Sequence, residues 1–289
     1  MKVCLIGTSG AAGMEAEHRF REAGFDVRPV SGRQDPNALV DEVFSLECDL
    51  TVLCIPEEAA IIVAPLLLLE ERVLDASPAF RFSKNAVYGM HEVYGTRVFK
   101  NATLVANPGC YAQGVISLLL PVARYWGKAA ASFRPSVSGI GGSSVGGKPL
   151  VSRAALGLAE TALYGLDQTH PHVAEIHQWS GFSKKLSFFP VVDPAFTRGM
   201  CVWTAFPKDV FEGITAEKLS LLYSEFSPFA RVSYNTSRIG VSCTGKEDPM
   251  GMTYTITDGG DVVTACLSYD NLGAGSAGRL VRNAQLMLA

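Results

Sequence analysis

Residues 2–13 read KVCLIGTSGAAG, a short apolar run that ends in a turn whose glycines are spaced three apart. Such spacing permits a tight turn and lets backbone N–H groups approach a pyrophosphate, and a following helix points its positive end at that anion. The pattern is a variant of the G-x-G-x-x-G fingerprint, and its place between a strand and a helix favours that interpretation over a turn that serves only packing. The expected cofactor-binding residues are Gly7, Thr8, Ser9, Gly10, Ala11, Ala12 and Gly13.

Outward from this turn, short apolar runs alternate with helical stretches over the first hundred residues. The expected strands lie at residues 3–6, 26–30, 50–55, 72–76 and 103–106, and the expected helices at residues 14–23, 38–46 and 59–68. This alternation is typical of βαβ units, so it predicts a parallel sheet that is covered on both faces.

The middle of the chain has a different pattern. A stretch rich in Gly and Ser at 136–147 precedes a helical segment at 151–164, and strand-like runs follow at 186–192, 200–205, 230–234 and 262–268, before a last helix at 275–288. We therefore predict an α/β fold with a doubly wound Rossmann-type nucleotide domain, residues 1–109 plus 269–289. An inserted α+β catalytic and oligomerisation domain spans residues 110–268, and we expect the active site in the cleft between the two.

Composition favours small-molecule chemistry. The chain has 289 residues, 48% hydrophobic and 18% charged, with a net charge of −3, which gives no electrostatic footprint for nucleic acid or an anionic membrane. We expect a cytoplasmic protein, because the N-terminus runs directly into a strand without a signal sequence. Seven cysteines at irregular spacing predict reduced thiols, and the absence of C-x-x-C pairs argues against a structural zinc.

The end of the second expected strand indicates which cofactor is bound. NAD-specific proteins commonly place an acidic residue there to hold the ribose hydroxyls. This chain instead has Ser31 and Arg33, a hydroxyl and a cation that suit a 2′-phosphate. NADP(H) is therefore the expected cofactor, with a solvated surface charge at Arg33 as the alternative.

Cys110 stands in Asn107-Pro-Gly-Cys-Tyr111, between an expected strand and an apolar helical stretch. At a helix N-terminus the dipole and the unpaired N–H groups favour a thiolate, which would lower the pKa of Cys110. The same donors could hold an oxyanion formed by attack on a carbonyl. Cys110 is therefore the candidate nucleophile, with an inert thiol as the alternative.

These residues resemble the active-site signature of the N-acetyl-γ-glutamyl-phosphate reductases of arginine biosynthesis, and the resemblance covers most of the chain. Further similar segments are Asp75-Ala-Ser-Pro-Ala-Phe-Arg81, Tyr88-Gly89 with Glu92, Leu166-Asp-Gln-Thr-His-Pro-His-Val-Ala-Glu-Ile176, and Asp270-Asn-Leu272 with Gly278 and Asn283. The resemblance implies an NADPH-dependent reduction of an acyl phosphate to an aldehyde with release of phosphate. The route is a thioester on Cys110.

The resemblance also places a histidine pair near the cysteine. We expect His170 to act as acid and base and His172 to orient the substrate, both from one face of an extended segment. Glu175 could orient an imidazole or contact the substrate. A metal site formed by His170, His172 and His177 is a rival interpretation that lacks a convincing fourth ligand.

A doubly anionic acyl phosphate requires cations and N–H donors. The candidates are Arg81, Lys148 and a turn at Ser138 and Gly139, although each could also be a solvated charge or a structural turn. Asn271, by the resemblance alone, would hydrogen-bond the nicotinamide amide. The expected partners are this small-molecule substrate and further copies of the chain, as a dimer or tetramer.

Three other functions stay open. A related acyl-phosphate or semialdehyde dehydrogenase, of the aspartate-semialdehyde type or from the lysine pathway, would share the architecture and the cysteine chemistry. A non-catalytic NADP-binding sensor would keep the glycine turn but would not need Cys110 with paired histidines. A cysteine-dependent acyltransferase or hydrolase would not need the N-terminal βαβ pattern, so cofactor binding separates it from the reductase.

Overall fold

The computed structural model describes residues 1–234, 236, 238–241 and 250–289. Its contacts divide the chain into two units, Met1–Gly109 with Ser276–Ala289, and Cys110–Gly275. Residues 269–275, which we expected in the nucleotide domain, belong to the second unit. One reason is a hydrogen bond from Gln113 Nε2 to the carbonyl of Ala274, 2.9 Å long, which ties this segment to the start of the second unit.

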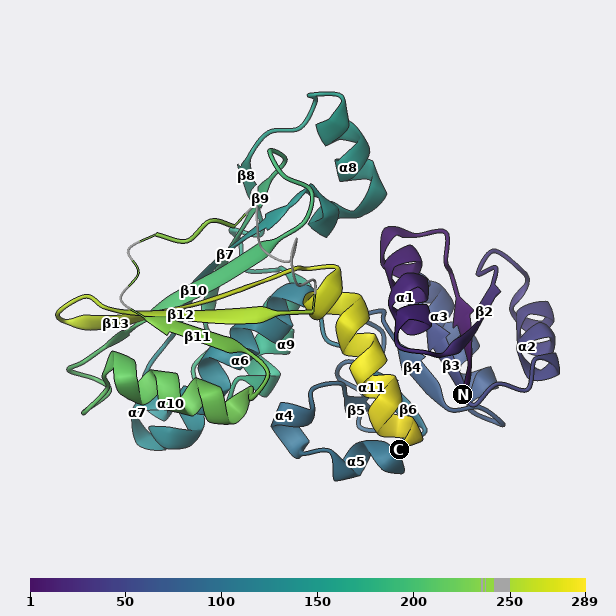
Figure 1. The fold of residues 1–289 in the computed structure, drawn as a ribbon, viewed down its shortest axis with the longest axis horizontal. Helices are drawn as coiled ribbons and strands as arrows, with labels where there is room; N and C mark the ends of the chain where they lie inside the picture. Colours follow the sequence, from purple (N-terminus) through teal and green to yellow (C-terminus); the bar gives the residue numbers. More distant parts are fainter. Residues whose placement is uncertain (235, 237, 242–249) are drawn as a thin grey trace. The chain divides into compact units, whose positions relative to one another are not determined.

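The first unit contains one parallel sheet of six strands in the order β2-β1-β3-β4-β6-β5 (Figure 1). Its strands are β1 (Lys2–Ile6), β2 (Asp26–Val30), β3 (Leu50–Leu53), β4 (Val73–Asp75), β5 (Val87–Tyr88) and β6 (Leu104–Ala106). Its helices are α1 (Ala11–Glu22), α2 (Pro36–Ser45), α3 (Glu57–Leu67), α4 (His91–Tyr94), α5 (Arg97–Lys100) and α11 (Gly278–Leu288). The parallel sheet predicted from the βαβ pattern is confirmed.

Both faces of this sheet are buried, and β1 shows why. Val3 and Leu5 pack in a cluster with residues of α1 and α11, whereas Cys4 and Ile6 pack in a second cluster with residues of α2 and α3. Successive side chains of a strand point to opposite faces, so a strand covered on both sides must be apolar throughout. The continuous apolar run that opened the sequence is therefore explained.

The second unit contains a seven-stranded sheet in the order β11-β12-β13-β10-β7-β9-β8. Its strands are β7 (Ser136–Gly142), β8 (Ala162–Leu163), β9 (Ser187–Asp193), β10 (Met200–Pro207), β11 (Arg231–Tyr234), β12 (Met252–Asp258) and β13 (Val262–Tyr269). Its helices are α6 (Cys110–Tyr125), α7 (Gly127–Ser132), α8 (Gly147–Ala155), α9 (Pro171–Trp179) and α10 (Ala216–Phe226), with short turns of 3-10 helix at Ser143–Gly146 and of π-helix at Gly273–Ala277.

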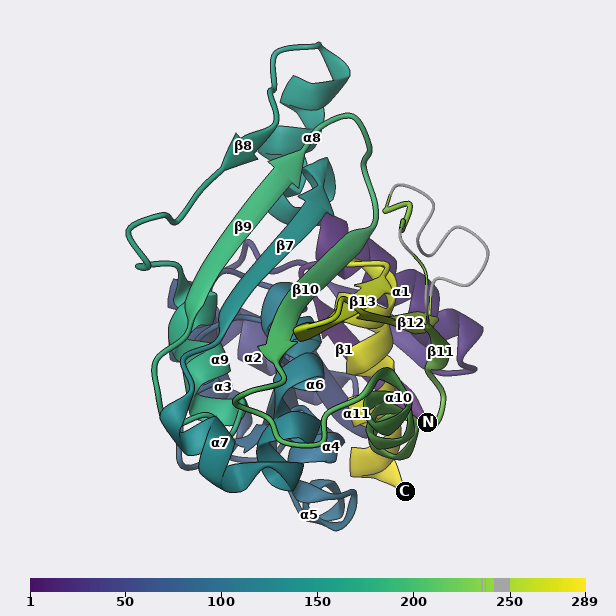
Figure 2. The same ribbon diagram turned by 90° about the vertical axis from the view of Figure 1, so that its left-hand side faces the viewer.

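Helix α6 packs on one face of this mixed sheet, against β10 and β13. Figure 2 shows the opposite face of β7, β9 and β10 turned towards the viewer, with α6 behind them. The sequence anticipated an α+β unit with a mixed or antiparallel sheet, and the pairing agrees: β7 and β9 are parallel, whereas β10 runs antiparallel to both β7 and β13.

Two local expectations for this unit were wrong. The helix expected at 151–164 ends at Ala155, because Gly157 adopts a left-handed conformation with φ of 68° and the chain then enters β8. The turn expected at Ser138 and Gly139, in the stretch rich in Gly and Ser, is instead part of strand β7. Helices α7, α9 and α10 and strands β8 and β12 were not anticipated.

The six described cysteines are free thiols, and Cys243 lies outside the described residues. No helix within the described ranges is long and apolar enough to cross a bilayer.

Candidate functional site

The glycine turn of the first unit is built by close backbone approach. Gly7 has φ of 92°, and a Cβ there would lie 2.4 Å from the carbonyl oxygen of Cys54. A Cβ on Gly13 would lie 2.2 Å from the carbonyl oxygen of Gly7, so the first turn of α1 can rest against the loop only without a side chain. Gly10 caps α1, whose opening N–H groups have no intrahelical acceptors. This arrangement fits a bound pyrophosphate.

Ser31 and Arg33 follow β2 and are both exposed. The backbone N–H of Arg33 donates to Ser31 Oγ at 3.4 Å, and the guanidinium makes no ion pair with any described residue. A Cβ on Gly32 would lie 2.6 Å from Ile55 Cγ2, so the tip of this loop is held close to the strand ends. The cation is therefore available to an anionic ligand.

We expect Arg33→Ala to weaken NADPH binding by about tenfold and to leave NADH binding almost unchanged, since only NADPH carries a 2′-phosphate and an exposed charged hydrogen bond contributes about that much. Fluorescence titration with both cofactors measures the two dissociation constants. Arg28→Ala is the matched control, because Arg28 is exposed on β2 and pairs with Asp26 at 2.7 Å. Equal losses for both cofactors would contradict a 2′-phosphate contact.

In the second unit, Cys110 is the first residue of α6 and is partly exposed. Helix α6 is apolar and almost wholly buried behind it, from Tyr111 to Ala123. The expected placement of the thiol at a helix start, next to N–H groups that a helix leaves unpaired, is thus observed. A sulfur there can attack a carbonyl carbon while those N–H groups face the developing oxyanion.

His170 and His172 lie close together, but not on an extended segment. His170 is the N-cap of α9 and Pro171 its first residue, so the chain turns into the helix between the two histidines. The His170 Nδ1 atom accepts the backbone N–H of His172 at 3.1 Å, and the ring centroids are 4.7 Å apart. The reason given for a shared face was therefore wrong, although the rings do meet.

The hydrogen bond at the N-cap determines which ring nitrogen of His170 carries the proton. A ring nitrogen that accepts a hydrogen bond carries no proton, so the neutral ring holds its proton on Nε2. Burial also lowers the pKa of His170, which favours this neutral form. Neutral His170 can therefore donate a hydrogen bond from Nε2, but it can serve as a base only by giving up the cap.

Two tyrosines that the sequence did not single out join this cluster. The Tyr164 ring lies 5.5 Å from that of His170, and the Tyr111 ring lies 6.1 Å from that of His172. Burial, and then the charge of a Cys110 thiolate, raise the pKa of Tyr164 to about 12, so its hydroxyl keeps its proton near the nucleophile. The sequence around Tyr164 gave no signal for a site residue. Tyr164 directly follows β8, a strand of two residues that is too short to produce a recognisable pattern.

The residues expected to bind substrate do not all lie in the expected places. Ser138 and Gly139 are not in a turn: they lie within β7, between β9 and β10. Arg81, in the first unit, is 7% exposed and donates from Nε to the carbonyl of Asn107 at 3.0 Å, which holds the chain just before Cys110. Lys148 is exposed on α8, and Glu175 is buried on α9.

Gly139 instead makes room for Tyr111. A Cβ on Gly139 would lie 2.7 Å from Tyr111 Cε1, and one on Gly141 would lie 3.0 Å from the Tyr111 hydroxyl. The ring can therefore lie on β7, where its hydroxyl donates to the carbonyl of Val191 at 2.8 Å. The glycine-rich stretch is a surface on which the residue after the nucleophile rests.

We expect Gly139→Ala to destabilise the protein by about 1–3 kcal/mol, because a well-packed ring must move to admit a methyl group. Urea unfolding measures the change. Gly127→Ala is the control: Gly127 begins α7, and a Cβ there meets nothing within 4 Å. Unfolding free energies that are the same for both variants would show that Tyr111 does not need the glycine.

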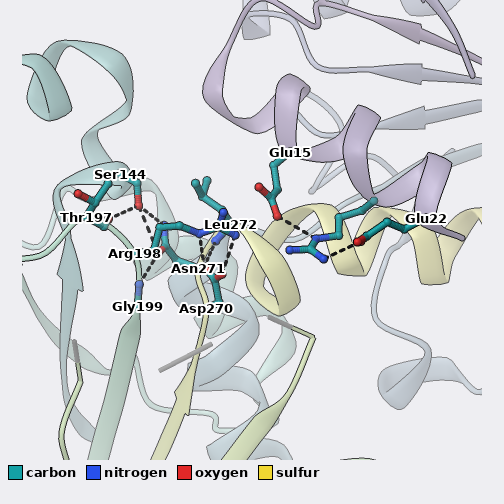
Figure 3. A network of polar contacts seen from close by, with 10 residues as sticks. Glu15, Glu22, Ser144, Thr197, Arg198, Gly199, Asp270, Asn271 and Leu272 are labelled. Atoms are coloured by element: carbon teal, nitrogen blue, oxygen red, sulfur yellow. Dashed lines mark hydrogen bonds and ion pairs between the residues drawn. The ribbon is translucent and has the colours of Figure 1, made fainter. Parts of the chain in front are cut away.

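Asn271 has partners within the second unit (Figure 3). Its Nδ2 donates to Ser144 Oγ at 2.9 Å, and its Oδ1 accepts the N–H of Gly199 at 3.0 Å. The neighbouring Asp270 pairs with Arg198 at 2.6 Å. Asn271 is 2% exposed, so the structure supports a role in fixing the segment after β13 more directly than contact with a nicotinamide.

No three His, Cys, Asp or Glu side chains among the described residues are arranged to hold a metal ion. His170, His172 and His177 therefore do not form the triad considered above.

Comparison with known proteins agrees with this geometry. The family model for the semialdehyde dehydrogenase dimerisation domain matches residues 110–271. A protein of Rhizobium etli named N-acetyl-gamma-glutamyl-phosphate reductase is 30% identical over 312 residues, covering 100% of this chain and 99% of its own. The chain belongs to the N-acetyl-gamma-glutamyl-phosphate reductase family. Another member, N-acetyl-gamma-glutamyl-phosphate reductase 2 of Pseudomonas putida, is 29% identical over 99% of this chain and 96% of its own.

Solved structures place this reductase-family chain in a wider fold group. Aspartate semialdehyde dehydrogenase II from Vibrio cholerae has a TM-score of 0.78 at 16% identity, over 99% of this chain and 98% of its own. The aspartate semialdehyde dehydrogenase from Francisella tularensis has a TM-score of 0.75 at 14% identity, over 99% of each chain. At this identity the likeness establishes the fold that the two enzymes share with this chain.

Proposed function

We propose that this chain reduces N-acetyl-γ-glutamyl phosphate to N-acetylglutamate semialdehyde, with NADPH as the reductant and release of phosphate. The observation that carries the proposal is Cys110 at the first residue of α6, in one unit with His170, His172 and Tyr164. Membership of the reductase family supports the same reaction and substrate.

The glycine turn fits the pyrophosphate of a nicotinamide cofactor. Gly7 and Gly13 form a cradle that a Cβ would fill, and Gly10 caps α1. The exposed guanidinium of Arg33 could bind a 2′-phosphate. When bound, the cofactor supplies the hydride that converts the acyl group to an aldehyde.

The protein's own residues perform the acyl and proton transfers. The Cys110 thiolate attacks the acyl carbon and displaces phosphate, which leaves a thioester. His170, held neutral by its cap, donates a hydrogen bond from Nε2 to the carbonyl oxygen. Protonated His172 gives a proton to this oxygen as the thiohemiacetal forms, and takes the same proton back as the aldehyde leaves and the Cys110 thiolate forms again. The hydrogen bond at the cap supports exchanging the roles that we expected for the two histidines.

The dimerisation-domain match supports assembly with a second copy through the unit Cys110–Gly275. The number of subunits, a cytoplasmic location and a cleft between the two units stay predictions.

The test is NADP⁺ reduction by the purified chain with N-acetylglutamate semialdehyde and inorganic phosphate. We expect turnover that requires phosphate, because the thioester is released by phosphorolysis in this direction. A parallel assay with aspartate semialdehyde covers the nearest alternative. Faster turnover with aspartate semialdehyde would replace the proposed substrate, and tight NADPH binding without any turnover would favour the sensor.

A further inference from the structure

Tyr269, the last residue of β13, contacts the backbone of the nucleophile. Its hydroxyl donates to the carbonyl oxygen of Cys110 at 2.7 Å, across 159 residues of sequence. The side chain is fully buried, and burial raises the pKa of Tyr269 well above its usual value, so the hydroxyl keeps the proton that it donates.

The same hydroxyl also meets Gly114. The hydroxyl therefore lies against both ends of the first turn of α6, at the carbonyl of residue 110 and beside residue 114. A Cβ on Gly114 would lie 2.2 Å from this hydroxyl, so the contact requires glycine at that position.

A second contact holds the same turn of α6. Gln113 Nε2 donates to the carbonyl of Ala274, so the segment after β13 is tied to the helix at Cys110 and again at Gln113. Asp270 within that segment is in turn fixed by Arg198 and by the N–H of Leu272. The end of β13 is therefore a rigid support for the start of the helix.

We propose that Tyr269 is a positioning residue for Cys110: its hydroxyl anchors the carbonyl of Cys110 at the first turn of α6 and so sets the direction in which the sulfur points. The inference rests on Cys110 being the nucleophile proposed above. Reacting atoms must meet within a narrow geometry, and a displacement of about 1 Å can slow a reaction about 100-fold. A hydroxyl that holds the nucleophile's own carbonyl acts on that geometry directly.

The test compares Tyr269→Phe with Tyr223→Phe. Tyr223 is also fully buried, and its hydroxyl donates to the carbonyl of Leu118 in the same helix at 3.0 Å, so the two variants lose the same kind of bond at different distances from Cys110. We expect Tyr269→Phe to lower kcat about 10- to 100-fold with little change in KM. Tyr223→Phe should keep the kcat of the unaltered protein.

A second measurement does not depend on the substrate. The rate of iodoacetamide alkylation of Cys110, followed by mass spectrometry with Cys48 as the internal reference, measures how accessible and reactive the thiol is. Alkylation of Cys110 should slow in Tyr269→Phe and stay unchanged in Tyr223→Phe. If the unaltered protein fails to turn over, the proposed function falls, but the alkylation rates still decide the role of Tyr269.

Gly114→Ala provides an independent variant, since its methyl group would displace the Tyr269 hydroxyl. Its effects on kcat and alkylation should match those of Tyr269→Phe, and the double variant should add little because both changes break one contact. The proposal is overturned if Tyr269→Phe keeps both rates within about twofold of the unaltered protein, or if Tyr223→Phe loses as much.

Discussion

Cys110→Ala is expected to lower phosphate-dependent turnover by a factor of about 10⁴ or more, since removing a covalent nucleophile leaves only the contribution of binding and oxyanion stabilisation. NADPH binding should be unchanged, because the residues proposed to bind the cofactor lie in the glycine turn and after β2. Steady-state NADP⁺ reduction measures the first quantity, and fluorescence titration the second.

The matched control is Cys48→Ala, which removes another partly exposed thiol. It should retain full activity. Mass spectrometry after mixing the acyl phosphate with protein in the absence of NADPH should show an acyl adduct on Cys110 in the unaltered chain and in Cys48→Ala. Turnover in Cys110→Ala above about one hundredth of the normal rate would rule out the thioester route.

His172→Asn is expected to lower kcat about 10²- to 10⁴-fold, the usual contribution of a positioned acid–base group. His170→Asn should lower kcat by a smaller factor, because asparagine is itself a good N-cap and its amide can still donate a hydrogen bond. Steady-state NADP⁺ reduction by the two variants measures both losses. The opposite order of effects would restore His170 as the acid–base residue.

Stability should depend on pH through His170 as well. Its folded-state pKa is lowered from 6.5, so the unfolded chain binds more protons in the window below that value. The free energy of unfolding therefore falls as pH decreases below about 6.5 and is fully recovered above it. His170→Asn should remove this part of the pH dependence, and thermal unfolding between pH 5 and pH 8 measures it. A pH dependence identical to that of the unaltered chain would show that the cap does not titrate.

Several features were readable because their causes lie within a few residues. The apolar run before Gly7 predicts a buried parallel strand, and the strand–turn–helix pattern around Cys110 places the thiol at a helix start. The N-cap at His170 was also readable, since a proline next to it is typical of a first helical position. Pro171 therefore indicates a helix start at this position rather than the extended segment that we expected.

Other features depended on the tertiary structure. The glycines at 139 and 141 could have indicated a loop, and only the packing of Tyr111 shows that they make room for a ring. Tyr164 carries no local mark, yet it meets His170 because β8 pairs with β9.

By itself the sequence indicated the candidate nucleophile, Cys110, and placed it at a helix start, because helix starts, turns and buried strands are specified by neighbours along the chain. The tertiary structure decided how that residue is held. The bond from Tyr269 to Cys110 joins positions 159 residues apart, so it exists only once β13 and α6 have packed together. No local propensity or spacing can encode a contact that long-range packing alone creates.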